Sequence, residues 1–367
     1  MDFRMIELGE LTDVDDPRGW AVEASTRLWR DELVRRYGDD DLASTVREDL
    51  ANSLAEPERR LVIWVAVPAH AAEEADSVLG VARLVLPQLD NRHLAEGSVI
   101  VHPDARRRGI GTALAQAMLD RCRADGRRVL ATWVGAIPPV PEEHENAVEV
   151  GTRRGWIDGS HPSTRFALAL GLRPEQLELH SVLQVPVELE ALQRLHDDAV
   201  GYADDYDLVT WEDSCPDEYA DGFAELAVAM STDMPQADLD LQPQVWDAAR
   251  IRRQEHRRSA AGLRSLTTAA RHLPSGRLVG YSTLLHNPDR AAAAHQEDTL
   301  VLGAHRGHRL GMLLKVWNLR RVEQVWPSVE RIHTWNAEEN GPMLTINFAI
   351  GFQVASIESA WQGHLDG

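Results

Sequence analysis

The chain has 367 residues, about twice the length of a typical domain, and a formal net charge of −20 from 58 acidic and 38 basic side chains. Such an acidic chain is poorly suited to binding nucleic acid through broad phosphate contacts, and its two cysteines exclude a disulfide-rich scaffold. The N-terminus lacks the apolar run of a signal peptide, and no apolar stretch reaches the length of a membrane span, so we expect a cytoplasmic protein without a membrane partner.

The first half begins with the order of elements of an α/β domain. Runs of Val, Ile and Leu predict strands, and apolar residues spaced by three and four predict helices. In chain order we expect a strand at 4–8, helices at 20–34 and 42–54, and strands at 61–67, 78–86 and 98–101. The last strand leads into a turn that contains glycine.

This Arg-rich turn joins the strand to an apolar helix at 112–124. Backbone N–H groups at such a helix start attract anionic oxygens, and glycine lets a ligand approach closely. The turn lacks the Lys-Ser/Thr pair of nucleotide hydrolases, and Leu114 stands where a dinucleotide fingerprint needs its third glycine. The expected anion-binding residues are Val101, Arg106, Arg107, Arg108, Gly109, Ile110 and Gly111.

The remainder of the first half contains a long insertion. We expect a strand at 129–134, a helix at 164–170 and a strand at 177–185 that closes the domain. Between them, residues 135–160 are rich in Pro, Glu and Gly, which predicts a loop with a short helix at most, covering the first cleft.

The second half repeats this order from about residue 207. We expect a strand at 208–212, helices at 219–231 and 244–258, and strands at 263–270, 277–286 and 299–302. A second turn follows, 200 positions after the first, and its residues are Val301, Arg306, Gly307, His308, Arg309, Leu310 and Gly311. Gly311 keeps the register of Gly111, whereas Arg309 replaces Gly109.

Two charged clusters in this half allow other interpretations. His305 and His308 suggest a metal site, but Arg306 and Arg309 beside them would repel a cation, so we expect no metal ion. The Arg-rich segment 250–258 is either a nucleic-acid patch or a set of ion pairs, and the acidic composition favours ion pairs.

The first turn, V-x-P-x-x-R-x-x-G-x-G before a helix, resembles motif A of the GNAT acyl-CoA N-acyltransferases. The second copy keeps Val301, Arg306 and Gly311, and the segments 335–343 and 347–352 resemble the next strand and helix of that family. The architecture therefore resembles the tandem GNAT enzymes, of which mycothiol synthase is one. This resemblance implies an α/β mixed-sheet fold in two tandem GNAT domains, 1–186 with the insertion and 187–367.

The resemblance also implies roles for individual residues. The amides of the two turns would hold the pyrophosphate of acetyl-CoA, Asn336 and Asn340 would hold its pantetheine arm, and a backbone N–H near Val301 would stabilise the thioester oxygen. Many family members have a tyrosine as general acid seven residues after the position of Asn340. Here Asn347 stands there, which can form hydrogen bonds but cannot titrate, so water or Tyr281 are the alternatives for protonating the thiolate.

Acetyl transfer to an amine needs a proton acceptor, because freeing the lone pair of an alkylamine at neutral pH costs roughly 4–5 kcal/mol. Glu297 and Asp298 are the carboxylates nearest to the expected cleft, so either could be the base. The alternative is that they are only solvated charges at the edge of the strand. Strand alternation places Glu297 on the face of Thr299, and Asp298 on the face of Leu300. Glu96 is expected to occupy a similar place in the first copy.

Three functions are compatible with these features. The leading one is an acetyl-CoA-dependent N-acetyltransferase for a small cationic amine, with the second half catalytic because Asn336, Asn340 and Asn347 lie there. An aminoacyl transferase that uses charged tRNA would need a basic groove, which the net charge of −20 disfavours. A non-catalytic acyl-CoA-binding protein is the third possibility. The sequence leaves the acceptor and the oligomeric state open.

Overall fold

A computed structural model of the chain describes residues 2–151 and 155–365. The chain forms two compact units, and each unit takes residues from more than one stretch of the sequence. Unit 1 comprises Met1–Leu177, Gln236–Gln242 and Ile357–Gly367. Unit 2 comprises Glu178–Pro235 and Pro243–Ser356.

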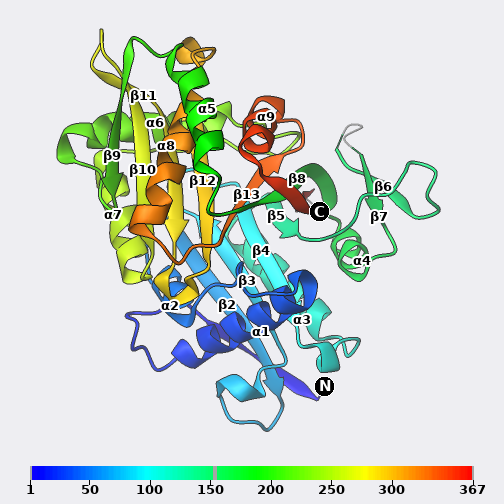
Figure 1. The fold of residues 1–367 in the computed structure, drawn as a ribbon. Helices are drawn as coiled ribbons and strands as arrows, with labels where there is room; N and C mark the ends of the chain where they lie inside the picture. Colours follow the sequence, from blue (N-terminus) through cyan, green and yellow to red (C-terminus); the bar gives the residue numbers. More distant parts are fainter. Residues whose placement is uncertain (1, 152–154, 366–367) are drawn as a thin grey trace. The chain divides into compact units, whose positions relative to one another are not determined.

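Unit 1 contains a mixed sheet in the order β1-β2-β3-β4-β5-β14. Its elements are β1 (Phe3–Leu8), α1 (Gly19–Tyr37), α2 (Val46–Asn52), β2 (Arg59–Pro68), β3 (Gly80–Pro87), β4 (Leu94–Val101), α3 (Ile110–Ala124), β5 (Val129–Val134), β6 (Ala147–Glu149), β7 (Trp156–Asp158) and α4 (Pro162–Ala169), together with most of β14 (Gln353–His364). Figure 1 shows these elements in blue to green, with β14 in red. Neighbouring strands are antiparallel except for β4 and β5, which are parallel.

Alternation along β2 explains why helices cover both faces of this sheet. Val62 and Trp64 pack in the cluster that includes Leu114 of α3, whereas Ile63 and Val65 pack in the cluster that includes α1. Successive side chains of a strand point to opposite faces, so an unbroken apolar run requires cover on both sides. Each fully buried side chain of this kind contributes roughly 1.5–3 kcal/mol of transfer free energy.

In unit 2 the strands follow the order β8-β13-β12-β11-β10-β9, again with mixed pairing. Its elements are most of β8 (Arg173–Gln184), α5 (Leu189–Val200), β9 (Tyr206–Glu212), α6 (Ala220–Asp233), α7 (Ala248–Ala260), β10 (Arg264–His272), β11 (Arg277–His286), β12 (Ala293–Val301), α8 (Leu310–Val325), β13 (Arg331–Ala337) and α9 (Gly341–Ile350). On β11, Tyr281 packs with α6 and Leu284 packs with α8, so these helices cover opposite faces.

The terminal strands of the two halves are exchanged. Residues 359–364 of β14, at the end of the chain, pair with β5 and complete the sheet of unit 1. Residues 178–184 of β8 pair with β13 and belong to unit 2. The expectation that the strand at 177–185 closes the first domain is therefore wrong, because that strand supplies the edge of β13. The sequence repeats 1–186 and 187–367 remain our proposed division of the chain.

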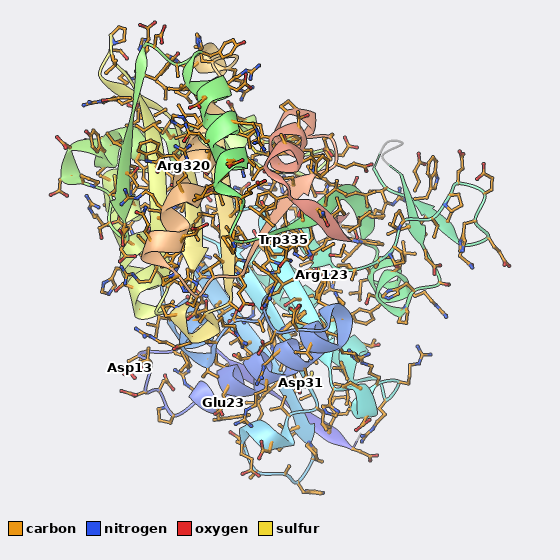
Figure 2. The ribbon with its side chains drawn as sticks, viewed as in Figure 1. Asp13, Glu23, Asp31, Arg123, Arg320 and Trp335 are labelled. Atoms are coloured by element: carbon orange, nitrogen blue, oxygen red, sulfur yellow. The ribbon has the colours of Figure 1, made fainter. Side chains whose placement is uncertain are left out.

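Two further segments differ from the sequence-based expectation. Residues 147–149 and 156–158 form the antiparallel pair β6–β7 where a loop with a short helix was expected, and Ile137, Val150 and Ile157 join the core of unit 1. Helix α5 was not predicted, and it packs along α8, where Arg320 donates a hydrogen bond to Gln193 at 2.7 Å (Figure 2). The other predicted strands and helices are present, with ends that differ by a few residues.

Within the described ranges, no helix combines the length and the apolar character that crossing a bilayer requires.

Candidate functional site

The strand before the second turn contains a β-bulge. The ladder between β11 and β12 pairs Tyr281 with Leu300 and Ser282 with Thr299, and then shifts, so that Leu284 pairs with Gln296. Two residues of β12, Glu297 and Asp298, therefore stand opposite Thr283 alone. An arrangement of two residues against one changes which face of the sheet the following side chains occupy.

This bulge brings both carboxylates to the same face. Glu297 and Asp298 together line a pocket of about 160 Å³ in unit 2. The expectation that strand alternation separates them is wrong, because the extra residue of the bulge resets the alternation beyond Asp298. The pocket is formed by β11, β12, α6, α7 and the residues between these helices, and it is lined by Phe223, Ala227, Met230, Ser231, Met234, Gln244, Trp246, Ile251, Gln254, Arg258, Tyr281, Thr283, Glu297 and Asp298.

The two carboxylates are accessible from the pocket, yet the surrounding protein still perturbs them. Desolvation raises the pKa of Glu297 to about 7, with the neighbouring Asp298 charge as the second cause. Desolvation also raises the pKa of Asp298, and a hydrogen bond of 3.0 Å from the Tyr281 hydroxyl opposes that rise. Near neutral pH, Glu297 can therefore exchange a proton readily, which is the property required of a general base.

Strand β4 of unit 1, which corresponds to β12, has no bulge. The ladder between β3 and β4 runs without a shift from Gly80 paired with Val101 to Val85 paired with Glu96. In unit 2 the residue that corresponds to Val85 is Leu285, and its partner in the ladder is His295. Glu96 thus corresponds to His295, and not to Glu297 or Asp298, which corrects the sequence-based expectation. Desolvation raises the pKa of the Glu96 carboxyl.

Unit 1 nevertheless contains a pocket of about 270 Å³ between α1, α2, β3 and β4. Its polar lining is internally paired, since Asp49 accepts hydrogen bonds from Thr26 at 2.7 Å and from Arg83 at 3.2 Å. Ser98 lines it from β4. This pocket offers no carboxylate free of a protein partner.

The second turn adopts the backbone conformation expected of an anion-binding helix start. Gly307 and Arg309 have φ angles of 87° and 53°, so Arg309 takes the left-handed conformation that Gly109 takes in the first turn, at φ 82°. Leu310 and Ile110 are buried beneath their turns and anchor helices α8 and α3. The amides at the start of each helix are therefore available to an anion.

Several arginines of the turns have structural partners. Arg306 donates to the carbonyl oxygen of Val301 and pairs with Asp233, and Arg106 donates in the same way to Val101. Arg309 pairs with Asp198. Arg106 also pairs with Glu32 at 2.9 Å, as Arg306 does with Asp233. The Arg309 guanidinium lies 4.4 Å from the centre of the Tyr202 ring, and His308 contacts the Tyr202 carbonyl oxygen.

Arg107 and Arg108 of the first turn are exposed, and they form no hydrogen bond or ion pair with any residue in the described ranges. Gly111 and Gly311 lie one residue inside their helices. A side chain at position 311 would approach Ile346 of α9 to 3.1 Å, so glycine here permits close packing of the two helices.

The three asparagines predicted from the resemblance lie near α9. Asn347 is fully buried and donates to Asn336 at 2.6 Å, while its own Oδ1 is buried without a hydrogen-bond partner. Asn340 caps α9 by accepting a hydrogen bond from the Met343 amide at 3.4 Å. The unpaired Oδ1 of Asn347 could accept a hydrogen bond from an amide N–H of a ligand.

A histidine cluster, His180, His295 and His333, lies around Trp335 and was missed at the sequence level. Parallel pairing of β12 with β13 ends at His295 and His333. His180 of β8 contacts His333 at 3.0 Å and stacks on Trp335, whose position on β13 is labelled in Figure 2. Burial lowers the pKa of His180 to about 4, so its imidazole is neutral near pH 7. Because His333 and Trp335 are two residues apart in a strand, they lie on the same face, and this spacing could have predicted the cluster.

Comparisons with known proteins bear on both units. A family model described as the acetyltransferase (GNAT) family matches residues 26–137. An uncharacterized N-acetyltransferase of Methanocaldococcus jannaschii is 35% identical over 72 residues, which are 19% of this chain and 29% of that protein. The chain thus spans less than a third of the length of this curated relative.

Two solved structures resemble the whole chain. A tandem GNAT protein from the clavulanic acid biosynthesis pathway is 27% identical, with 100% of this chain and 99% of that chain covered and a TM-score of 0.71. A GCN5-related N-acetyltransferase from Sphaerobacter thermophilus is 14% identical, with 99% and 96% covered and a TM-score of 0.60, which shows likeness of fold alone.

Proposed function

We propose that the chain transfers an acetyl group from acetyl-CoA to a small amine at the pocket of unit 2, because residues 26–137 match the acetyltransferase (GNAT) family and the whole chain resembles a solved tandem GNAT protein. The mixed α/β class and the tandem GNAT fold predicted from the sequence are confirmed. The reaction and the residues that perform it remain our proposal.

The bulge in β12 is the observation that carries this proposal. It places Glu297 and Asp298 in one pocket, directly before the turn that leads into α8. The corresponding strand of unit 1 has a regular ladder, in which Ser98, paired with Arg83, stands in place of the two carboxylates. We therefore assign catalysis to unit 2 and propose that unit 1 binds acyl-CoA without turnover.

Glu297 is the proposed general base. With a pKa raised to about 7, its carboxylate can accept the proton that the ammonium group of the acceptor must lose. The neutral amine then attacks the thioester carbonyl, the attacking nitrogen loses its second proton to water, the carbon–sulfur bond breaks, and the departing thiolate takes up a proton. Water is the candidate donor for that last step, because burial and the Asp298 charge raise the pKa of the Tyr281 hydroxyl well above its ordinary value.

The residues of both turns fit the anionic end of acetyl-CoA, which supplies the activated acetyl group. The turn at Gly307 to Gly311 offers the first amides of α8, and the turn at Arg107 to Gly111 adds two arginines without protein partners. Asn347 offers a buried acceptor without a hydrogen bond, and Asn336 positions it. Because Asn347 cannot titrate, we assign it to binding and not to proton transfer.

The decisive experiment measures release of the CoA thiol from acetyl-CoA over a panel of small primary amines. We expect amine-dependent thiol release by wild type, and at least a hundredfold lower kcat for Glu297→Gln, in line with the usual contribution of a general base. Glu323→Gln, an exposed carboxylate on α8, is the matched control. Stoichiometric acetyl-CoA binding without thiol release for any amine would instead identify a non-catalytic acyl-CoA-binding protein.

A further inference from the structure

The pocket of unit 2 contains one arginine. Arg258 lies in the last turn of α7 and lines the pocket together with Glu297 and Asp298. Gln254, one helical turn earlier, lines the same pocket, as expected for residues four apart on one helix face. The pocket therefore presents one cationic group and two acidic groups to its occupant.

The side chain of Arg258 forms no hydrogen bond and no ion pair with any residue in the described part of the chain. Its neighbours on α7 behave differently. Arg252 pairs with Glu255 at 2.7 Å and with Asp217 at 2.6 Å, and Arg250 lies 4.3 Å from the centre of the Trp246 ring. An arginine directed at a pocket without a protein partner has its hydrogen-bond donors available to a ligand.

The charge of Arg258 nevertheless acts on the two carboxylates of the pocket. It lowers the pKa of both Glu297 and Asp298, against the larger effect of desolvation. No nitrogen of Arg258 comes within 4.0 Å of either carboxylate, since that distance would define an ion pair. The opposite charges share the pocket without neutralising each other by contact.

In the pocket of unit 1, an arginine is paired directly with a carboxylate of the same pocket. There Arg83 contacts Asp49 at 3.2 Å, and Asp49 also accepts the Thr26 hydrogen bond. An arginine that served only to balance buried carboxylates would be expected to contact them in this way. Arg258 makes no such contact, so a direct ion pair with these carboxylates does not account for its position.

We propose, on the basis of the proposed function, that the acceptor is a small amine that also carries a carboxylate, and that Arg258 binds this carboxylate. The amine would lie toward Glu297 and Asp298, where its proton is removed. The planar guanidinium can hold a carboxylate through two parallel hydrogen bonds, and Gln254 can add a donor. A volume of about 160 Å³ limits the occupant, or the part of it that enters, to a small group.

The apolar lining constrains the rest of the acceptor. Met230, Met234 and Trp246 form part of the wall and suit a short hydrocarbon or flat portion between the two charged groups. A purely cationic acceptor would be matched by the two carboxylates but would leave the guanidinium of Arg258 without a partner. The acceptor class is thus a zwitterionic amino acid or a compound like one, in place of the simple cation expected from the sequence.

Matched substrates test this assignment. Each of several amino acids is compared, in thiol release with acetyl-CoA, with its carboxamide and with the amine that lacks the carboxyl group. We expect wild type to prefer the carboxylate form by at least tenfold in kcat/KM. Arg258→Gln should reduce that preference at least tenfold, mainly through KM, and Arg258→Lys should retain part of it. Arg253→Gln, an exposed position on the same helix, is the control.

Binding of the same compounds, measured by calorimetry without acetyl-CoA, separates this inference from the proposed function. Turnover of all three forms with equal kcat/KM, unchanged by Arg258→Gln, would overturn the carboxylate site and leave the acetyltransferase standing. Absence of turnover, with amino-acid binding that is lost in Arg258→Gln, would support the site and overturn the activity. Absence of both turnover and binding would overturn both.

Discussion

Tyr281 donates its hydroxyl hydrogen to Asp298 at 3.0 Å, across the ladder between β11 and β12 and immediately beside the bulge. Tyr281 is itself buried, with the Phe223 ring packed edge-on at 5.0 Å between centroids. The hydrogen bond therefore ties a rigid aromatic side chain to one of the two pocket carboxylates. It distinguishes Asp298, which has a fixed partner, from Glu297, whose side chain has none among the described residues.

Replacing Tyr281 by Phe should raise the pKa of Asp298 further. The tyrosine hydrogen bond stabilises the ionised carboxyl group, and without it only the charge of Arg258 opposes desolvation. We expect the carboxyl carbon of Asp298 to titrate at higher pH in carbon-13 NMR, and the unfolding free energy to fall by about 1 kcal/mol. Tyr202→Phe, which removes an exposed hydroxyl, is the control. An unchanged titration of Asp298 would contradict the role given to this hydrogen bond.

Lys315, the single lysine of the chain, is buried in α8 with the Phe352 ring 5.8 Å from its ammonium nitrogen. Burial lowers its pKa to about 7. A base with a lowered pKa binds fewer protons folded than unfolded, so it costs stability below its unfolded pKa, and the cost is largest below pH 7.

Lys315→Met should therefore increase the unfolding free energy at pH 6 by a few kcal/mol, at about 1.4 kcal/mol for each pKa unit recovered. The gain should shrink as the pH approaches the ordinary pKa of lysine. Denaturant unfolding at several pH values measures it. A loss of stability at pH 6 would show that a partner in the folded protein stabilises the ammonium group, and would contradict the lowered pKa.

The two turns should differ in how charge reversal affects acetyl-CoA binding. Arg107→Glu with Arg108→Glu removes two arginines that have no protein partner, whereas Arg309→Glu also breaks the pair with Asp198. We expect two acetyl-CoA sites in calorimetry of wild type, and one in either variant. Arg309→Glu should lose more turnover than the double variant, because we place catalysis in unit 2. The reverse order would move the catalytic site to unit 1.

The sequence predicted those parts of the fold that depend on local patterns. The duplicated turns, the apolar strands on either side and the helices α3 and α8 follow from glycine positions and from periodicity. The exchange of β8 and β14 could not be predicted in this way. Both strands have the length and composition of an edge partner for a GNAT sheet, and only long-range pairing decides which sheet each one joins.

The candidate site was predicted in its residues but not in its geometry. Glu297 and Asp298 were singled out, yet they were placed on opposite faces because strand alternation was assumed to continue. The three consecutive polar residues Gln296, Glu297 and Asp298, which do not fit a strict apolar–polar alternation, were the signal of the bulge. Arg258 was considered only as part of a basic segment, since sequence cannot distinguish a paired arginine from one that faces a pocket.

The role of Glu297 as the base of an N-acetyltransferase can be decided by measuring the pH dependence of kcat/KM in wild type and Glu297→Gln. The carboxylate is the active form and takes its proton from the bound ammonium group, so kcat/KM of wild type should rise as pH increases through about 7, the pKa of Glu297, and then level off. In Glu297→Gln the limb near pH 7 should be absent, and kcat/KM should instead rise only as the free amine loses its proton. A Glu297→Gln profile that keeps the wild-type limb near pH 7, with kcat/KM within a few fold of wild type, would contradict it.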